Sequence, residues 1–269
     1  MITLIYIFIF CLGCIIGSFL NVVIYRFNSG KTLGGRSMCM TCSKTLSWYE
    51  LIPVISFLFQ KGKCNTCATK ISHQYPIVEF ITGAVFTAVA YHFSPLLSYA
   101  FNQYVLLVTL YTMMFSLLIV ISVYDMRHKI IPDMLVFVFG IFAFSSMFIN
   151  QGIGSSMLIQ PTFLSLISGV VYALPFALIS LVSRQRLMGF GDSKMILGIG
   201  WMLGLMQGGA AIMLAFWIGT LASLAVMFIG RHKVSMNTEV PFGPFLAISA
   251  FLVFIFNINI FDLASVFTF

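Results

Sequence analysis

The stretch Met1–Tyr25, MITLIYIFIFCLGCIIGSFLNVVIY, contains no charged side chain. Its length exceeds the ~20 residues that an α-helix needs to cross the hydrocarbon core of a membrane. It lacks the basic segment that precedes the core of a signal peptide, and it is too long for such a core. The stretch therefore predicts a first membrane-spanning helix that stays in the protein.

The composition of the whole chain also indicates a membrane protein. Of the 269 residues, 60% are hydrophobic and only 8% are charged, and the mean hydropathy is +1.05. Soluble domains carry about 25% charged residues, so the composition indicates an all-α integral membrane protein in contact with membrane lipids. The net charge of +7 is interpreted as charge that sets the orientation in the membrane, and no nucleic-acid partner is expected.

Apolar runs predict about eight spans. They are residues 2–25, 77–97, 103–124, 131–149, 162–183, 193–207, 209–229 and 241–261. The sixth run is short and rich in glycine, and with the seventh it could form a tight hairpin through Gln207, Gly208 and Gly209.

The basic residues support this division. With eight spans, all 14 Lys and Arg residues fall in segments on one side of the membrane. The positive-inside rule makes that side cytoplasmic and places both termini outside. Three parts are then expected: a first helix over 1–25, a cytoplasmic subdomain over 26–76, and a seven-helix membrane core over 77–269. The oligomeric state is not readable from the sequence.

The cytoplasmic segment contains two Cys-x-x-Cys pairs. They are Cys39 with Cys42 and Cys64 with Cys67. Two such pairs can present four thiolates tetrahedrally, which suits a structural Zn²⁺ that holds a small core together. Disulfides are disfavoured on the reducing side of the membrane. Redox-active thiols and thiols without a ligand stay open as interpretations.

Among the seven acidic residues, Asp125 and Asp192 draw attention. Asp125 ends the third predicted span and Asp192, in GFGD, begins the sixth, so both are expected at the cytoplasmic edge. An ionisable group at membrane depth is a functional candidate. Two carboxyl groups that share a proton can act as base and acid in peptide hydrolysis. This pattern favours an aspartic protease dyad.

Different roles for these acids stay open from the residues alone. Asp125 could form an interfacial ion pair with Arg127 or Lys129, and Asp192 could cap its helix. Asp133 fits an acid at the start of the fourth span. The membrane acids could also form a proton or ion pathway.

Several strings then converge in order along the chain. They are GCIIGSFLNVVIYR, the two Cys-x-x-Cys pairs around LSWYELIPVISFLFQKGKC, ISHQYPIVEFITG, DMRHKIIPD, GFGDSK and PFGPFLA. Together they resemble the type IV prepilin peptidase family of GxGD aspartic membrane proteases, which process proteins of type IV pili, type II secretion and competence systems. The resemblance covers nearly the whole chain.

The resemblance implies a bifunctional enzyme of the bacterial inner membrane. Asp125 and Asp192 would cleave the leader of prepilins or pseudopilins after a glycine, at the cytoplasmic face. The new N-terminal residue would then be methylated with S-adenosylmethionine as the donor. The four cysteines match the family's zinc-type motif.

The methyltransferase site is less visible, because no G-x-G-x-x-G follows a predicted strand. By location we favour the cytoplasmic segment near Trp48 and Tyr49, with Glu50 or Glu79 orienting the amine or accepting its proton. These two glutamates could instead be simple charges, on the subdomain surface and at a helix end. Two further functions compete with the enzyme: a proton-coupled membrane transporter and a zinc-bearing scaffold without catalysis.

Overall fold

The structure is a computed structural model, and it describes residues 2–30, 32, 34–149, 157–185, 188–229 and 241–265. Its described part is helical, without strands, which confirms the all-α class. Clustering of the chain gives two compact units, residues 1–94 and 95–269. Glu239, with its neighbours between residues 230 and 240, lies outside the described residues.

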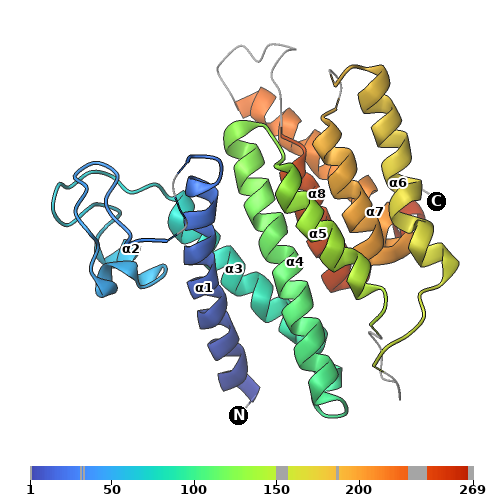
Figure 1. Ribbon diagram of the computed structural model, residues 1–269, viewed down its shortest axis with the longest axis horizontal. Helices are drawn as coiled ribbons and strands as arrows, with labels where there is room; N and C mark the ends of the chain where they lie inside the picture. The colour runs from blue at the N-terminus through green and yellow to red at the C-terminus, as the bar shows by residue number, and fades with distance from the viewer. Residues whose placement is uncertain are drawn as a thin grey trace. The chain divides into compact units, whose positions relative to one another are not determined.

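Unit 1 contains two long helices and the loop between them (Figure 1). The helices are α1 (Ile2–Arg26) and α3 (Gln74–His92), and the loop carries the 3-10 helix η1 (Trp48–Leu51) and the short α2 (Ile55–Phe59). Helices α1 and α3 touch at glycines: a Cβ on Gly17 would lie 2.7 Å from the Cα of Glu79. Small residues of this kind let two membrane helices approach closely.

Unit 2 is a bundle of longer helices. It contains α4 (Phe101–His128), α5 (Asp133–Ser146), α6 (Phe163–Val182), α7 (Phe190–Ile229), α8 (Gly243–Phe256) and α9 (Ile260–Ser265), and the 3-10 helix η2 (Ser94–Leu97) lies at the border of the two units. Tyr111 of α4 stacks on Phe254 of α8, with ring centroids 4.7 Å apart. Phe139 of α5 is fully buried against Gly198 of α7. These contacts join α4, α5, α7 and α8 around one apolar core.

Each predicted span coincides largely with a helix, but the sixth and seventh lie within α7. In the described residues, four helices are long and apolar enough to cross a membrane: α1, α4, α6 and α7. Helices α5 and α8 are apolar but shorter. The structure thus supports a membrane protein with several spans, and the number eight stays a prediction.

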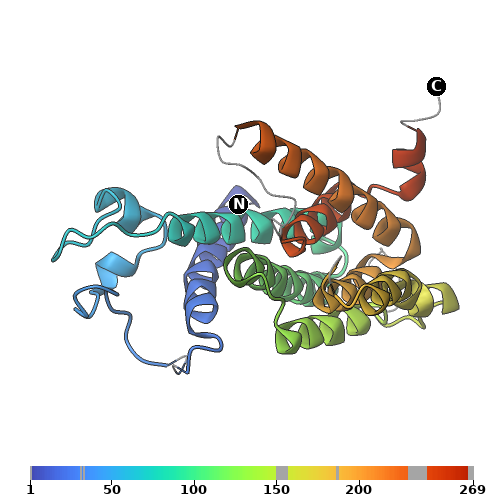
Figure 2. The same cartoon turned by 90° about the horizontal axis from the view of Figure 1, so that it is seen from above.

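The expected hairpin at Gln207–Gly209 is wrong in position. The break in α7 is at Gly204, whose φ of 75° and ψ of −175° are not helical, while residues 207–209 are helical. Figure 2 shows the two segments of α7 running in different directions from the bend. Gly208 and Gly209 serve packing instead, because a Cβ on either would contact the ring of Tyr172 in α6.

Candidate functional site

Asp125 and Asp192 are both buried at one end of unit 2. Asp125 lies in the last turn of α4 and is 5% exposed, and Asp192 lies in the first turn of α7 and is 8% exposed. Figure 1 shows these two helix ends at the same end of the bundle. The two carboxyl groups interact electrostatically, so the structure brings the predicted pair into one region.

The two carboxyl groups differ in their partners. Asp125 Oδ2 accepts a hydrogen bond of 3.0 Å from the backbone amide of Gly243. Asp192 Oδ1 is buried and has no hydrogen-bond partner among the described residues. A buried polar atom without a partner costs free energy and calls for an explanation. Asp192 Oδ1 is therefore an atom that can accept a hydrogen bond from a water molecule or, when protonated, donate one to a carbonyl oxygen.

Gly243 is a residue to which the sequence analysis assigned no role. It is the first residue of α8, with a proline next to it in the first turn, and its amide is one of the N–H groups that a helix start leaves without an internal partner. That amide orients the Asp125 carboxyl group. The glycine followed by Pro244 is a readable helix-start signal, but it does not reveal a partner 118 positions away in the chain.

We expect Gly243→Ala to lower peptide cleavage by about 10- to 100-fold, with the protein still folded and inserted. A Cβ at this position would lie 2.8 Å from Asp125 Oδ2, so the carboxyl group must move, and small misplacements of a catalytic group cost rate on this order. Steady-state cleavage by the purified variant checks this. Gly140→Ala in α5 is the matched control, since nothing lies within 4 Å of the added Cβ. Equal rates for both variants would contradict the role given to Gly243.

The glycines around Asp192 have separate functions. A Cβ on Gly189 would lie 3.3 Å from Asp192 Oδ2, so Gly189 leaves space beside the carboxyl group. A Cβ on Gly191 would lie 2.7 Å from the Cβ of Ile131, so Gly191 allows close packing there rather than access for a peptide. Of the two glycines, therefore, only Gly189 leaves space at the Asp192 carboxyl group itself.

Asp133 and Lys194 form an ion pair of 2.6 Å. Asp133 lies in the first turn of α5, as expected, and the pair links that turn to the start of α7. Both side chains are exposed, so the pair contributes about 0–1 kcal/mol to stability. Asp133 thus has a structural partner and stands apart from the buried acids.

The four cysteines of unit 1 come together as predicted. The sulfur atoms of Cys39, Cys42, Cys64 and Cys67 all lie within 4.8 Å of one another. The two pairs use the same turn: the amide of each first cysteine donates to a carbonyl group five residues later, in Lys44 and Thr69. Each turn also has a positive φ four residues after its first cysteine.

The cluster fits a tetrahedral metal site. The Sγ atoms of Cys39 and Cys67 are 3.8 Å apart. Four thiolates around Zn²⁺ at about 2.3 Å would be separated by about 3.8 Å. Because all four positions are filled by protein atoms, such a metal would be structural, and the residues present suit it.

Glu79 and Glu50 are both buried, so Glu50 is not a simple charge on the subdomain surface. Glu79 Oε2 accepts a hydrogen bond of 2.7 Å from the amide of Val54. Val54 has a φ of 62°, which is strained for a β-branched residue. The loop is therefore held in a costly conformation that aims an amide at Glu79.

Glu50 has a local structural role. Its carboxylate and Ser47 form a capping box at the start of η1, and Asn65 Nδ2 donates to Oε1 at 3.0 Å. The hydrogen bond from the Ser47 amide, together with the one from Asn65, holds the pKa of the Glu50 carboxyl group below its ordinary value. With both oxygens occupied, Glu50 stabilises the loop more directly than it could serve a reaction.

A cavity of about 730 Å³ lies in unit 1 between α1, α3 and the loop. Its lining includes both glutamates, Asn21, and the stacked pair Tyr25 and Tyr75, whose ring centroids are 5.0 Å apart. This volume is in the range of small-molecule sites. Of the four residues that the sequence analysis named for methyl transfer, Glu50 and Glu79 line this cavity, and Trp48 and Tyr49 do not.

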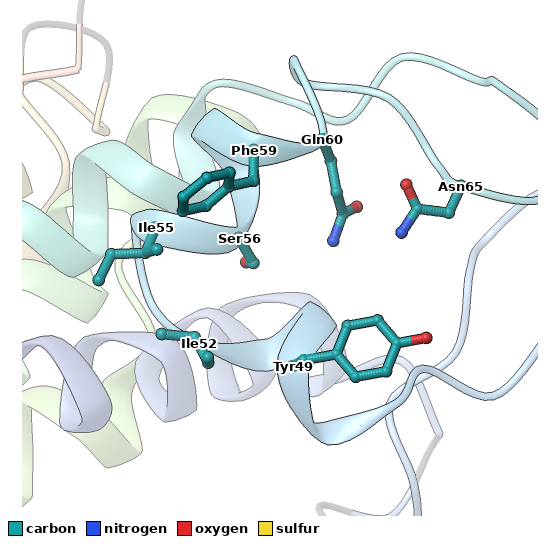
Figure 3. A pocket seen from close by; sticks show the side chains of 7 residues that line it. All are labelled: Tyr49, Ile52, Ile55, Ser56, Phe59, Gln60 and Asn65. Carbon is teal, nitrogen blue, oxygen red and sulfur yellow. The ribbon is translucent and has the colours of Figure 1, made fainter.

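A smaller pocket of about 330 Å³ lies beside it (Figure 3). It is lined by Tyr49, Ile52, Ile55, Ser56, Phe59, Gln60 and Asn65. Ser56 and Gln60 also line the larger cavity, so the two are neighbours. Trp48 is 78% exposed and lines neither.

Comparison with known proteins gives similarity over nearly the whole chain. Residues 11–93 match the bacterial peptidase A24 N-terminal domain, and residues 112–230 match the type IV leader peptidase family. A protein of Bacillus subtilis strain 168, named prepilin leader peptidase/N-methyltransferase, is 30% identical over 94% of both chains. Relatives of the same name in Dichelobacter nodosus and Vibrio cholerae are 31% and 30% identical, over 94% and 89% of this chain and 92% of each of theirs. No solved structure matches.

Proposed function

The chain belongs to the type IV leader peptidase family, and on that premise we propose that it is a prepilin leader peptidase and N-methyltransferase. It removes the leader from type IV prepilins or pseudopilins after a glycine and methylates the new N-terminal residue. The named relatives favour this function over a proton-coupled transporter.

The observation that carries the peptidase assignment is the pair of buried carboxyl groups, Asp125 and Asp192, at helix ends of an apolar bundle. One carboxylate takes a proton from a water molecule, which attacks the carbonyl carbon of the scissile bond. The other, protonated, donates to the carbonyl oxygen as it gains charge. Collapse of the tetrahedral intermediate breaks the carbon–nitrogen bond, and the proton taken from water passes to the leaving amine.

The two carboxyl groups differ in how they are held and in what they can bind. The Gly243 amide fixes Asp125 through Oδ2. Asp192 Oδ1 has no partner among the described residues, so it can accept from the water or, when protonated, donate to the carbonyl oxygen. Gly189 leaves space beside Asp192. A glycine before the cut would keep the substrate narrow enough for this buried site.

The proposed location is the bacterial inner membrane, with the active site toward the cytoplasm. The one-sided distribution of the 14 basic residues supports this orientation. A prepilin with a basic leader in the cytoplasm and a hydrophobic helix in the bilayer would present its scissile bond at that interface.

We propose Zn²⁺ as the metal of the cysteine cluster. The 3.8 Å separation of Cys39 and Cys67 sulfurs supports it, and four thiolates are typical of structural zinc. The metal would close the loop between α1 and α3 and so shape the neighbouring cavity, whose lining includes Cys39 and Cys64.

The cavity of unit 1 is the proposed site of S-adenosylmethionine, which supplies an electrophilic methyl group when bound. Its volume and its mixed lining of aromatic rings, basic side chains and carboxylates suit a ligand with an adenine ring and charged groups. Glu79 is the better candidate for handling the amine, because Ser47 and Asn65 occupy both oxygens of Glu50, whereas the Val54 amide donates to Oε2 of Glu79.

Purified protein in liposomes, given a synthetic prepilin and S-adenosylmethionine, tests both activities. We expect a released leader ending in glycine and a mature peptide whose mass is increased by one methylene group. Cleavage without methylation would overturn the methyltransferase half alone. An intact prepilin after long incubation would overturn the peptidase.

A further inference from the structure

Asn21, a residue of the large cavity's lining, carries a buried polar atom that has no hydrogen-bond partner among the described residues. The side chain is 1% exposed and belongs to the cavity lining. Its Nδ2 donates to the carbonyl oxygens of Gly17 and Tyr75, at 3.3 and 3.1 Å. Since two carbonyl groups can accept but not donate, they fix the orientation of the amide. Oδ1 is then a buried acceptor without a partner among the described residues.

Glu79 lies close to Asn21 along the crossing of α1 and α3. In α1, Asn21 follows Gly17 by one helical turn, and Gly17 packs on Glu79. In α3, Tyr75 precedes Glu79 by one turn, and its carbonyl oxygen accepts from the Asn21 amide. Two residues of the cavity lining, Asn21 and Glu79, therefore carry a neutral acceptor and an anionic acceptor, a combination that suits a cationic or neutral amine.

We propose that Asn21 Oδ1 and the Glu79 carboxylate bind the methyl-accepting amine, the new N-terminus of the processed pilin. This inference rests on the proposed methyltransferase function. The cavity lining comes in part from the two long apolar helices of unit 1 and in part from the loop. We therefore assign the amine, which is attached to a hydrophobic membrane helix, to the side of the cavity formed by α1 and α3. We assign the soluble methyl donor to the side formed by the loop.

The chemistry needs an acceptor of this kind. An α-amino group has an ordinary pKa of about 8, so it arrives mainly as an ammonium ion without a lone pair. Glu79 takes one proton, and Asn21 Oδ1 accepts a hydrogen bond from a remaining N–H. The nitrogen lone pair then forms a bond to the methyl carbon, the carbon–sulfur bond breaks with its electrons on sulfur, and Glu79 returns its proton to solvent. Asn21 is a binding residue and Glu79 the base.

The test uses the full-length protein with a processed pilin peptide, varying peptide and S-adenosylmethionine separately. Asn21→Leu should raise the KM for the peptide at least about 10-fold, with the KM for the donor within about twofold. Thr87→Val is the matched control, since Thr87 bonds within α3 to Gly83 and does not line the cavity.

Each other outcome overturns the inference. A raised KM for the donor would assign the site to the donor's own amino group. Loss of leader cleavage together with peptide affinity in Asn21→Leu would make Asn21 a structural link between α1 and α3. Unchanged peptide KM in Asn21→Leu would sink this inference alone, whereas a wild-type protein that methylates no peptide would sink the proposed methyltransferase as well.

If Asn21→Leu does not fold, Glu79→Gln carries the test. We expect its kcat for methyl transfer to fall at least about 100-fold at unchanged KM for the donor, and leader cleavage to persist. A rate that recovers at high pH, where the amine loses its proton to solvent, would distinguish a lost base from a lost fold. A wild-type rate in Glu79→Gln would overturn the role of Glu79.

Discussion

Asp192→Asn should reduce leader cleavage by about a thousandfold or more, with the protein inserted in the membrane at the normal level. Asparagine has nearly the same shape, so the first turn of α7 keeps its packing, but it can neither take nor hold the proton that the reaction moves. Removal of a positioned acid or base costs about 10² to 10⁴ in rate. Single-turnover cleavage of a prepilin by the purified variant measures this loss.

Asp125→Asn should show a similar loss, and the double variant should be little worse than either single one, because the two groups act as a unit. Asp133→Asn is the matched control: its exposed pair with Lys194 contributes little, and cleavage should stay within about twofold. Normal cleavage by either Asp125→Asn or Asp192→Asn would show that the chemistry lies elsewhere.

Cys39→Ser should remove the metal and unfold the loop of unit 1. Purified wild-type protein is expected to contain about one zinc ion per chain, and the loss of one thiolate opens a site whose binding free energy is about 10–16 kcal/mol. Elemental analysis gives the metal content, and limited proteolysis of residues 34–73 reports the loop. Leader cleavage should persist, since the aspartates belong to unit 2.

Cys11→Ser provides the comparison for this experiment. Cys11 is a free thiol in α1 and does not belong to the cluster, so its replacement should leave the metal content unchanged. Freshly reduced wild-type protein without metal would contradict the zinc site. Full metal content in Cys39→Ser would contradict the four-thiolate ligand set.

Strong sequence patterns predicted two groups of residues, the cysteine cluster and the aspartate pair. The repeated Cys-x-x-Cys spacing predicted the cysteine cluster, because each pair needs only one tight turn. The one-sided basic residues predicted a common depth for Asp125 and Asp192. The structure puts them in the last turn of α4 and the first turn of α7, two helix ends that lie at the same end of unit 2 (Figure 1). In each case the pattern depends little on how helices pack.

The features that the sequence did not reveal depend on packing between distant segments. Gly243 contacts Asp125 across 118 positions, and no local pattern encodes that distance. The bend of α7 occurs at Gly204 rather than at Gln207–Gly209, since the later glycines are used against Tyr172. Glu50 is different, because its role is local: Ser47 and Glu50 have the spacing of a capping box, which can be recognised in the sequence.

The most direct test of the central claim is the intact mass of a prepilin co-expressed with this protein, as wild type or with both Asp125→Asn and Asp192→Asn. The wild type should convert the prepilin to a mature form that lacks the leader and carries one additional methylene group. The double variant should leave the prepilin at its full mass. A processed pilin in cells that contain only the double variant would contradict the claim that these two carboxyl groups form the peptidase site.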